Sequence, residues 1–264
     1  MKKVFAVAAA FLILTGCGQP EQGSSSLPQD VPGSALSTES LNCRILYRME
    51  ESLLLVQEEE HMATEDLILL TPAGIEISDE QGNPAQPSQL EAGTTVRIEY
   101  DGSVLETYPC QLGGVTALQM TGTFESLLPF YLDRIDELYQ KDAGLNDGAE
   151  KIVLDLTEVT NLTEGEKEAV CYLVGCRYEK EVFQSTYEQL CEEGQIDRDN
   201  PYYKDGMILS FSEKNQSGRS FTLSGMKWRS GLGAVGYSDA KVKQKNEQWQ
   251  CKIEQWFISL ICSL

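Results

Sequence analysis

The sequence contains a single histidine, His61, and few basic residues. Its 21 Lys and Arg stand against 41 Asp and Glu, which gives a formal net charge of -20. One histidine excludes a metal site built from several histidines and makes any Ser-His-Asp or Cys-His mechanism depend on His61 alone. The acidic excess argues against nucleic acid, because phosphate binding needs clustered Lys and Arg. We therefore predict no nucleic-acid partner, no metal site, no cofactor and no catalytic residue set.

Long hydrophobic runs are also missing. The longest apolar stretch near the start of the chain, residues 4–14, is shorter than the roughly 20 residues that a helix needs to cross a bilayer. Hydrophobic residues nevertheless make up 41% of the 264 residues, and aromatic residues 8%, so the chain has enough apolar side chains for packed cores. A length of this size favours two ordinary domains.

The N-terminus has the plan of a secretory signal peptide. Lys2 and Lys3 precede the apolar residues 4–14, and Leu14-Thr15-Gly16-Cys17 follows. This last run resembles the lipobox of bacterial lipoproteins, which implies cleavage after residue 16 and a diacylglyceryl group on Cys17. The alternative is an ordinary secreted protein with a cysteine near its cleavage site. We expect residues 1–16 to be removed and the mature protein to be extracytoplasmic, anchored to the membrane through Cys17.

Residues 17–42 are predicted to be the lipidated cysteine and a flexible linker. Residues 18–42 lack aromatic and basic residues and contain three prolines and a run of three serines, a composition that cannot bury a core. Loss of residues 1–16 removes two lysines and no acid, so the net charge of -20 becomes -22. The acidic bias therefore belongs to the exported part of the chain.

Residues 43–120 show short period-2 runs separated by turn residues, which predicts a small all-β domain. The predicted strands cover residues 44–49, 53–56, 67–71, 75–77, 94–100 and 114–118. Near its end, Tyr100-Asp101-Gly102 and Glu106-Thr107-Tyr108-Pro109-Cys110-Gln111 resemble a motif of YobA-like bacterial lipoproteins, a family of unknown activity. The resemblance implies an OB-like barrel. It departs at Cys110, where a small residue is expected, so a role of this cysteine is not implied.

Residues 121–264 begin with a different period. Apolar residues recur at three and four over 124–139 and predict a helix, with Ser126 as its N-cap and Pro129 in its first turn. A strand is expected at 151–156. Capping boxes are predicted at Thr163/Glu166 and Ser185/Glu188 and mark two further helices. The strands expected after Gly206 cover residues 207–212, 219–229, 233–243 and 248–260.

Helices followed by an antiparallel meander predict an α+β domain over residues 121–264. The element order is weakly similar to the NTF2-like and cystatin-like folds, in which a curved sheet wraps a helix. The fold class expected for the whole chain is therefore α+β: an N-terminal OB-like barrel followed by a domain with helices and an antiparallel sheet.

Two motifs in the second domain match enzyme patterns without the required context. Gly231, Gly233 and Gly236 spell G-x-G-x-x-G, but the following residues predict a strand hairpin and not the helix of a dinucleotide site. Ser224 and Lys227 spell S-x-x-K, but the surrounding residues predict a strand, in which positions i and i+3 face opposite sides. Neither motif predicts an enzyme.

The cysteines allow one bridge within the β domain. Of eight cysteines, lipidation of Cys17 leaves seven, so at least one thiol is unpaired in a monomer. Cys43 and Cys110 are the only pair within 43–120, and an oxidising export compartment permits a disulfide between them. Free buried thiols are the alternative.

Aromatic and basic residues gather near the C-terminus. Trp228, Arg229 and Tyr237 are the candidate ligand-binding residues, on the hypothesis that a curved sheet encloses a pocket. Ordinary core and cross-strand packing is the alternative. Eight basic residues between 214 and 252 stand against Asp239 and Glu247. They indicate either a surface for an anionic ligand or a solvated sheet face.

These patterns favour a noncatalytic module that binds a protein, an envelope polymer or a small ligand outside the membrane. The alternative is an envelope hydrolase that uses carboxylates such as Asp155 or Glu158. With so many acids in the chain, the sequence alone does not select a catalytic pair.

Overall fold

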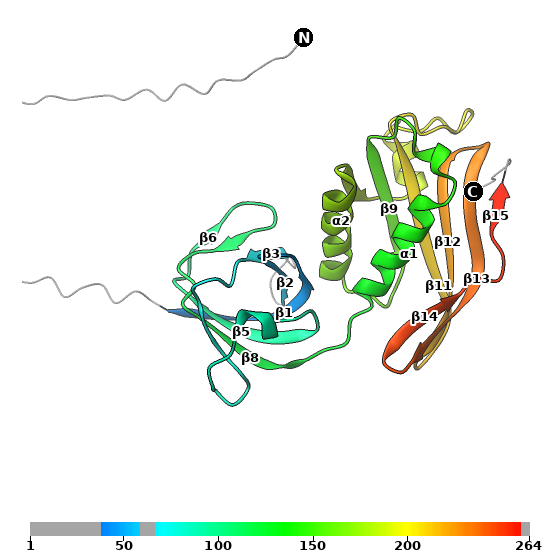
Figure 1. Cartoon of the computed structure of the whole chain (residues 1–264). Coiled ribbons are helices and arrows are strands. Elements are labelled where there is room, and N and C mark those ends of the chain that lie inside the picture. The colour runs from blue at the N-terminus through cyan, green and yellow to red at the C-terminus, as the bar shows by residue number, and fades with distance from the viewer. Residues whose placement is uncertain (1–37, 59–66, 260–264) are drawn as a thin grey trace, which may run out of the picture. The chain divides into compact units, whose positions relative to one another are not determined.

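The computed structural model describes residues 38–58 and 67–259, all of which lie in one compact unit, Ser37–Leu264. The predicted signal peptide, Cys17 and His61 lie outside the described residues. The described chain is a mixed α/β protein that consists mostly of β-sheet, with three α-helices (Figure 1).

The first sheet has the strand order β3-β2-β1-β5-β8-β4. Its strands are β1 (Glu39–Arg48), β2 (Leu53–Gln57), β3 (Leu67–Leu70), β4 (Glu76–Ser78), β5 (Thr94–Tyr100) and β8 (Ala117–Thr123). The strands predicted at 53–56 and 94–100 are confirmed. Strand β1 begins at Glu39, so the last residues of the segment predicted as linker belong to the sheet.

A period-2 pattern builds the core of this sheet, because alternate side chains of a strand point to one face. The buried cluster contains Cys43, Ile45, Leu53, Leu55, Ile68, Leu70, Ile77, Leu90, Val96, Ile98 and Leu118. The first and last strands of the order, β3 and β4, do not pair with each other. Strands β6 (Val104–Leu105) and β7 (Gln111–Leu112) pair as a hairpin, and Cys110, directly before β7, forms a single bridge to Ile68 of β3. The described strands do not form a closed barrel, so the expected OB-like barrel is not confirmed.

The second sheet has the order β10-β9-β11-β12-β13-β14, with β15 pairing to β13. Its strands are β9 (Lys151–Glu158), β10 (Glu181–Gln184), β11 (Gly206–Ser217), β12 (Ser220–Ser230), β13 (Gly233–Lys245), β14 (Gln248–Lys252) and β15 (Phe257–Ser259). The run expected as one strand at 248–260 is two strands that pair with different parts of β13. A break at residues 253–256 makes this possible.

This sheet is mixed, which corrects the prediction of an antiparallel sheet. Strand β9 is parallel to both β10 and β11, and only the strands from β11 to β14 form the expected antiparallel meander. Parallel pairs need a crossover, and α2 (Glu164–Tyr178) supplies it between β9 and β10. The second crossover, from β10 to β11, contains α3 (Tyr187–Glu192).

The helix ends follow their capping residues. Helix α1 (Leu128–Gln140) has Leu127 at its N-cap; Ser126, predicted for that position, lies one residue earlier and accepts a hydrogen bond from the Leu128 backbone N–H. The Thr163/Glu166 capping box of α2 is confirmed. The box of α3 is Thr186/Gln189, one residue later than the predicted Ser185/Glu188 pair. The sequence offers both pairs as a capping box, and the hydrogen bonds form at the later pair, Thr186 and Gln189.

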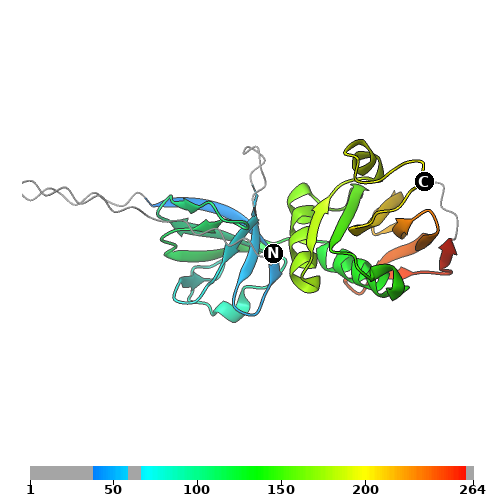
Figure 2. The same cartoon turned by 90° about the horizontal axis from the view of Figure 1, so that it is seen from above.

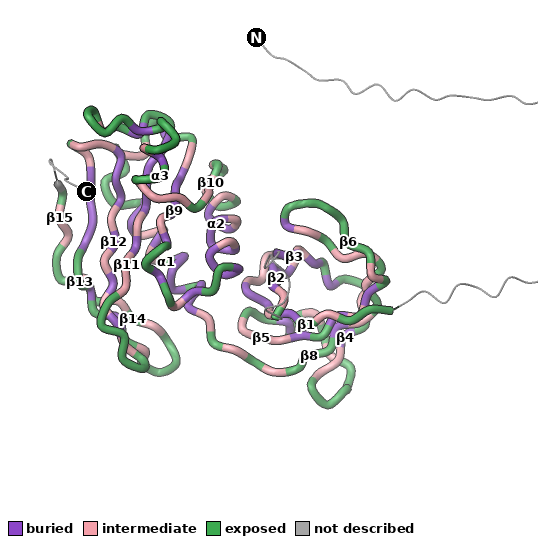
Figure 3. Tube along the Cα trace, turned by 180° about the vertical axis from the view of Figure 1, so that it is seen from behind, coloured by how far each residue is buried: buried purple, intermediate pink, exposed green. Residues whose placement is uncertain are grey.

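Helices α1 and α3 lie on opposite sides of the second sheet (Figure 2). The face under α1 and α2 carries the larger apolar core. Its buried strand residues include Ile152, Leu154, Leu156, Met207, Leu209, Phe211, Phe221, Leu223, Tyr237, Ala240 and Val242. Burial is greatest along the middle strands and falls off at the hairpin that contains β14 (Figure 3).

A buried lysine fastens the C-terminal end of α1 to the sheet. Lys227 of β12 is fully buried, and its Nζ donates hydrogen bonds to the backbone oxygens of Tyr139 and Asp142 at 2.9 and 3.0 Å and to Oδ1 of Asn146 at 3.0 Å. Carbonyl groups at a helix C-terminus have no partner within the helix and attract positive charge. Lys227 therefore ties three acceptors at this helix end to the sheet. The Tyr139 oxygen also accepts a hydrogen bond from Nδ2 of Asn146, and the Asp142 oxygen also accepts one from the Leu145 backbone N–H.

Burial lowers the pKa of Lys227 from 10.5 to about 8. Between these two pH values the unfolded chain holds a proton that the folded chain has released, so the free energy of unfolding rises with pH. We expect Lys227→Met to remove this rise, which amounts to about 1 to 3 kcal/mol. Urea unfolding at pH 7.5 and 9.5 checks it.

Buried thiols act in the opposite direction, because burial raises the pKa of Cys171 to about 12. They affect wild type and Lys227→Met equally, so the informative quantity is the difference in the free energy of unfolding between these two proteins. A difference that stays constant from pH 7.5 to 9.5 would contradict the lowered pKa.

Candidate functional site

The second face of the second sheet is only partly covered. Near one end of the strands, the segment that contains α3 packs on this face and buries a small core of Val153, Leu190, Ile196, Tyr203, Ile208, Trp228 and Ala234. Two residues further along β9 and β11 the side chains become polar, with Asp155 and Ser210. On β12, Met226 still packs against this core, and Ser224 follows it on the same face. We call this uncovered part of the sheet the open face.

A groove of about 430 Å³ lies on the open face beside α3. Its floor is a register row across five strands: Asp155 pairs with Ser210, Ser210 with Met226, Met226 with Gly236, and Gly236 with Phe257. A Cβ at Gly236 would approach the Gly225 backbone oxygen to 2.4 Å and a ring atom of Phe257 to 2.8 Å. Glycine at this position thus lets β15 close the side of the groove.

A second row of polar residues extends the groove along the strands. Ser212 pairs with Glu158 on one side and with Ser224 on the other. Thr186 and Glu188, at the start of α3, line the groove beside the sheet. The lining therefore combines several hydroxyl groups with three carboxylates, and Met226 and Phe257 add apolar surface.

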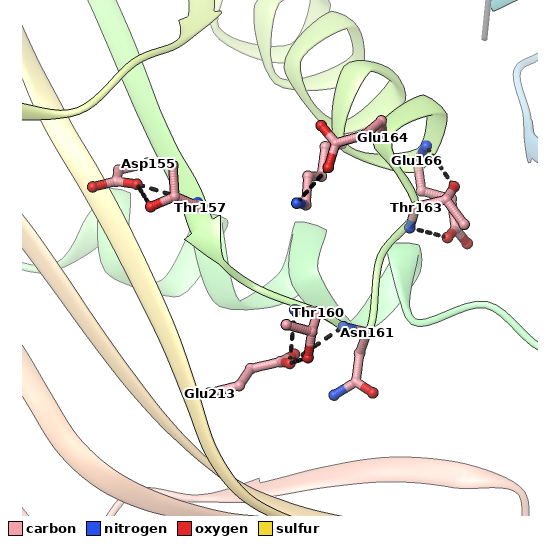
Figure 4. A network of polar contacts seen from close by, with 9 residues as sticks. Asp155, Thr157, Thr160, Asn161, Thr163, Glu164, Glu166 and Glu213 are labelled. Carbon is pink, nitrogen blue, oxygen red and sulfur yellow. Dashed lines mark hydrogen bonds and ion pairs between the residues drawn. The ribbon is translucent and has the colours of Figure 1, made fainter. Parts of the chain in front are cut away.

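Asp155 is held in place by its own strand. The Thr157 hydroxyl donates to Oδ1 of Asp155 at 2.6 Å, and the Thr157 backbone N–H donates to the same oxygen at 3.2 Å (Figure 4). Oδ2 of Asp155 makes no hydrogen bond to any residue that the structure describes. Asp155 thus presents a positioned carboxylate with one oxygen able to accept a hydrogen bond from a ligand.

The strand end next to the groove is fixed by Glu213 of β11. Its Oε2 accepts hydrogen bonds from the backbone N–H groups of Thr160 and Asn161 at 3.0 and 3.2 Å (Figure 4). Its Oε1 accepts a hydrogen bond from the Tyr131 hydroxyl. Burial, followed by the bond to Glu213, raises the pKa of Tyr131. This network joins the loop after β9 to β11 and α1, which keeps β9 rigid where it lines the groove.

The three predicted ligand residues separate in the structure. Tyr237 is buried in the core under α1 and α2 and borders the groove only where it pairs with Gly225. Trp228 is buried under α3 with its ring edge-on to Tyr187, at a centroid distance of 5.1 Å. Arg229 points to the other face, where its Nη1 donates to the backbone oxygens of Leu145 and Asp147.

The carboxylates named for a hydrolase do come together. Asp155 and Glu158 both line the groove, and Glu188, which the sequence did not single out for chemistry, lies there too. Ser224 also lines the groove, whereas Lys227 is buried on the helix face, so the expectation that S-x-x-K residues face opposite sides is confirmed. Gly231 lies in the turn between β12 and β13, and Gly233 and Gly236 lie in β13. The residues after them continue as strands, as predicted, and not as the helix of a dinucleotide site.

The predicted bridge between Cys43 and Cys110 remains a prediction. Cys43 is a fully buried free thiol in the core of the first sheet, and Cys110 packs against the same core. Burial raises the pKa of Cys43, with smaller contributions from Glu58 and Cys110. In this state Cys43 is protonated and unreactive.

Comparison with known proteins gives little further guidance. No family model matches the chain, and no curated protein matches it. The NMR solution structure of residues 21–120 of Bacillus subtilis YobA is similar at 12% sequence identity, covering 37% of this chain and 90% of that chain, with a TM-score of 0.20. At this TM-score the similarity carries no argument about fold or activity.

The described residues contain no group of three or more His, Cys, Asp or Glu side chains arranged to hold a metal ion. None of their helices is both long enough and apolar enough to cross a membrane.

Proposed function

We propose that this chain is an extracytoplasmic binding module, anchored to the membrane through a lipid on Cys17, whose polyhydroxylated ligand occupies the groove on the open face. The observation that carries the proposal is the lining of the groove, which contains Ser and Thr hydroxyls together with Asp155, Glu158 and Glu188. Carboxylates accept hydrogen bonds strongly from ligand hydroxyls, and Ser and Thr both donate and accept.

The residues that line the groove are held in fixed positions, as a binding site requires. Its residues come from strands that are hydrogen-bonded neighbours, and Asp155 and the end of β9 are fixed by the contacts of Thr157 and Glu213. Fixed polar groups lose little conformational entropy when a ligand binds. Met226 and Phe257 supply apolar surface for the carbon skeleton of a sugar or polyol.

Two finer features belong to the same proposal. The lipid anchor would be followed by the linker, and the first sheet would be an OB-like, YobA-like module that accompanies the binding domain. For the second domain, the NTF2-like or cystatin-like comparison is supported by a sheet with a helix-covered face and an open face.

We expect Asp155→Asn to weaken binding of maltohexaose, a neutral polyhydroxylated probe, by about tenfold, because the amide replaces a charged acceptor and loses a charge-assisted hydrogen bond. Isothermal titration calorimetry measures the change. The matched control is Asp133→Asn on the exposed side of α1, which should leave the affinity unchanged. Equal affinities of wild type and Asp155→Asn, or no binding to wild type, would reject the groove as a site for neutral polyols.

A carboxylate hydrolase is the second candidate, and the meeting of Asp155 with Glu158 in one groove favours it. Two carboxyl groups that flank a glycosidic bond are the usual machinery of glycoside hydrolysis. Chromatography of the bound oligosaccharide after incubation separates the two functions. Recovery of intact probe supports binding, and shortened products that disappear in Glu158→Gln support hydrolysis.

A further inference from the structure

The polar rows of the groove lead directly into a row of lysines. On β11, Lys214 follows Ser212 by two residues and therefore shares its face. Lys214 pairs with Thr222, Thr222 with Lys241, and Lys241 with Lys252, which forms one register row across four strands. We call Lys214, Lys241, Lys243 and Lys252 the lysine surface; all four are exposed.

This surface retains free positive charge. Lys241 and Lys252 share Glu254, at 3.2 and 3.8 Å, which offsets the repulsion between two lysines that lie directly opposite each other. Among the described residues, no carboxylate lies within ion-pair distance of Lys214 or Lys243. Asp239 and Glu247 are the other exposed acids on β13 and its turn.

The distance between the groove and the lysine surface is short compared with the length of a polymer ligand. Residues two apart on a strand are about 6.8 Å apart, so the lysine row begins about that distance from Ser212 and Ser224. Lys241 and Lys243 repeat the same spacing along β13. At physiological salt, charges more than about 8 Å away are screened, so an anion here responds to these lysines rather than to the net charge of -20.

We infer that the ligand is a linear polyhydroxylated polymer with an anionic group on each repeat, whose hydroxyl-rich part occupies the groove while its anions lie on the lysine surface. The inference rests on the proposed function, since it extends the same ligand from the groove along the strands. Phosphate and carboxylate groups both fit the lysines, because an ammonium acts as a point charge without a geometric preference between them.

The experiment compares four probes of six repeats each by calorimetry: glycerol phosphate oligomer, hexagalacturonate, neutral maltohexaose and linear polyphosphate. The test variant is Lys214→Gln with Lys243→Gln, because neither lysine has an ion-pair partner among the described residues. The control is Lys204→Gln with Arg198→Gln, two exposed residues in the loop after α3, which changes the net charge equally.

We expect at least one of the two anionic polyols to bind wild type more tightly than both maltohexaose and polyphosphate, and the tighter one identifies the anion. The test variant should weaken that probe roughly tenfold and leave maltohexaose within twofold, since each lost phosphate or carboxylate contact removes salt-sensitive affinity. The control variant should change neither.

Three results would overturn the inference. The first is that neither charged polyol binds more tightly than maltohexaose. The second is that polyphosphate binds as tightly as the charged polyols. The third is that the test variant has the same affinity for the charged polyol as the control variant. If maltohexaose still depends on Asp155 in any of these cases, the proposed function stands without its anionic extension. If no polyhydroxylated probe binds, the proposed function fails as well.

Discussion

Lys227→Ala is expected to lower the free energy of unfolding by about 3 to 5 kcal/mol. The substitution deletes a fully buried side chain and leaves a cavity between β12 and the end of α1. It also removes the three hydrogen bonds that Nζ donates to the backbone oxygens of Tyr139 and Asp142 and to Oδ1 of Asn146. Chemical denaturation followed by tryptophan fluorescence measures the change.

Lys243→Ala is the matched control, because it removes an exposed lysine from the adjacent strand. Its effect should stay within about 0.5 kcal/mol, as for most surface substitutions. Lys227→Met should fall between the two, since methionine fills most of the space but donates no hydrogen bond. If Lys227→Ala were as stable as Lys243→Ala, the buried ammonium would not fasten α1 to the sheet.

Trp228→Ala is expected to cost about 3 to 5 kcal/mol. Its ring fills the core between the sheet and α3, where it contacts Tyr187 edge-on and packs with Leu190 and Ile208. Loss of this core should release the α3 segment, which forms one side of the groove. Thermal unfolding by circular dichroism measures the loss of stability.

Trp228→Phe tests whether the role is packing or polar recognition. The indole Nε1 of Trp228 has no hydrogen-bond partner among the described residues, so phenylalanine removes an unsatisfied donor while it keeps an aromatic ring. We expect Trp228→Phe to cost less than about 1.5 kcal/mol and to leave maltohexaose affinity unchanged. A stable Trp228→Phe protein with lost binding would instead place Trp228 in contact with the ligand.

Local patterns predicted much of the secondary structure. Strict alternation over residues 94–100 predicted a strand, and the structure has a strand at Thr94–Tyr100. Apolar residues spaced by three and four over 124–139 predicted a helix, and the structure has a helix at Leu128–Gln140. Thr163 and Glu166 marked the start of α2 because their side chains and backbone N–H groups satisfy each other. These features depend on residues within one turn or one strand.

Features that depend on distant pairing were not predicted. Strand β10 has only four residues and shows no long alternation, so the parallel pairing of β9 with β10 and β11 was missed. Closure of the first sheet was expected from a family resemblance, but strand alternation alone does not say which edges meet. The parallel pairing of β9 and the closure of the first sheet both depend on which strands, far apart in the chain, pair with each other.

The candidate site illustrates the same limit. Trp228 and Arg229 are neighbours in the sequence, but adjacent residues of a strand face opposite sides of the sheet. Trp228 is covered by the α3 segment, and Arg229 is covered by the loop after α1. The groove instead joins Asp155, Ser210 and Met226 across three strands. Serines on a strand carry no distinctive motif, so only the alternation of polar residues at 210, 212 and 214 could have marked the open face.

The most direct test of the groove as the ligand site is amide chemical-shift mapping by NMR during titration with the glycerol phosphate oligomer. The account predicts saturable shifts at the amides of Asp155, Ser210, Ser212 and Ser224, continuing to Lys214, with the helix face unchanged. Saturable shifts confined to the first sheet or to α1 and α2, with these groove amides unmoved, would contradict it.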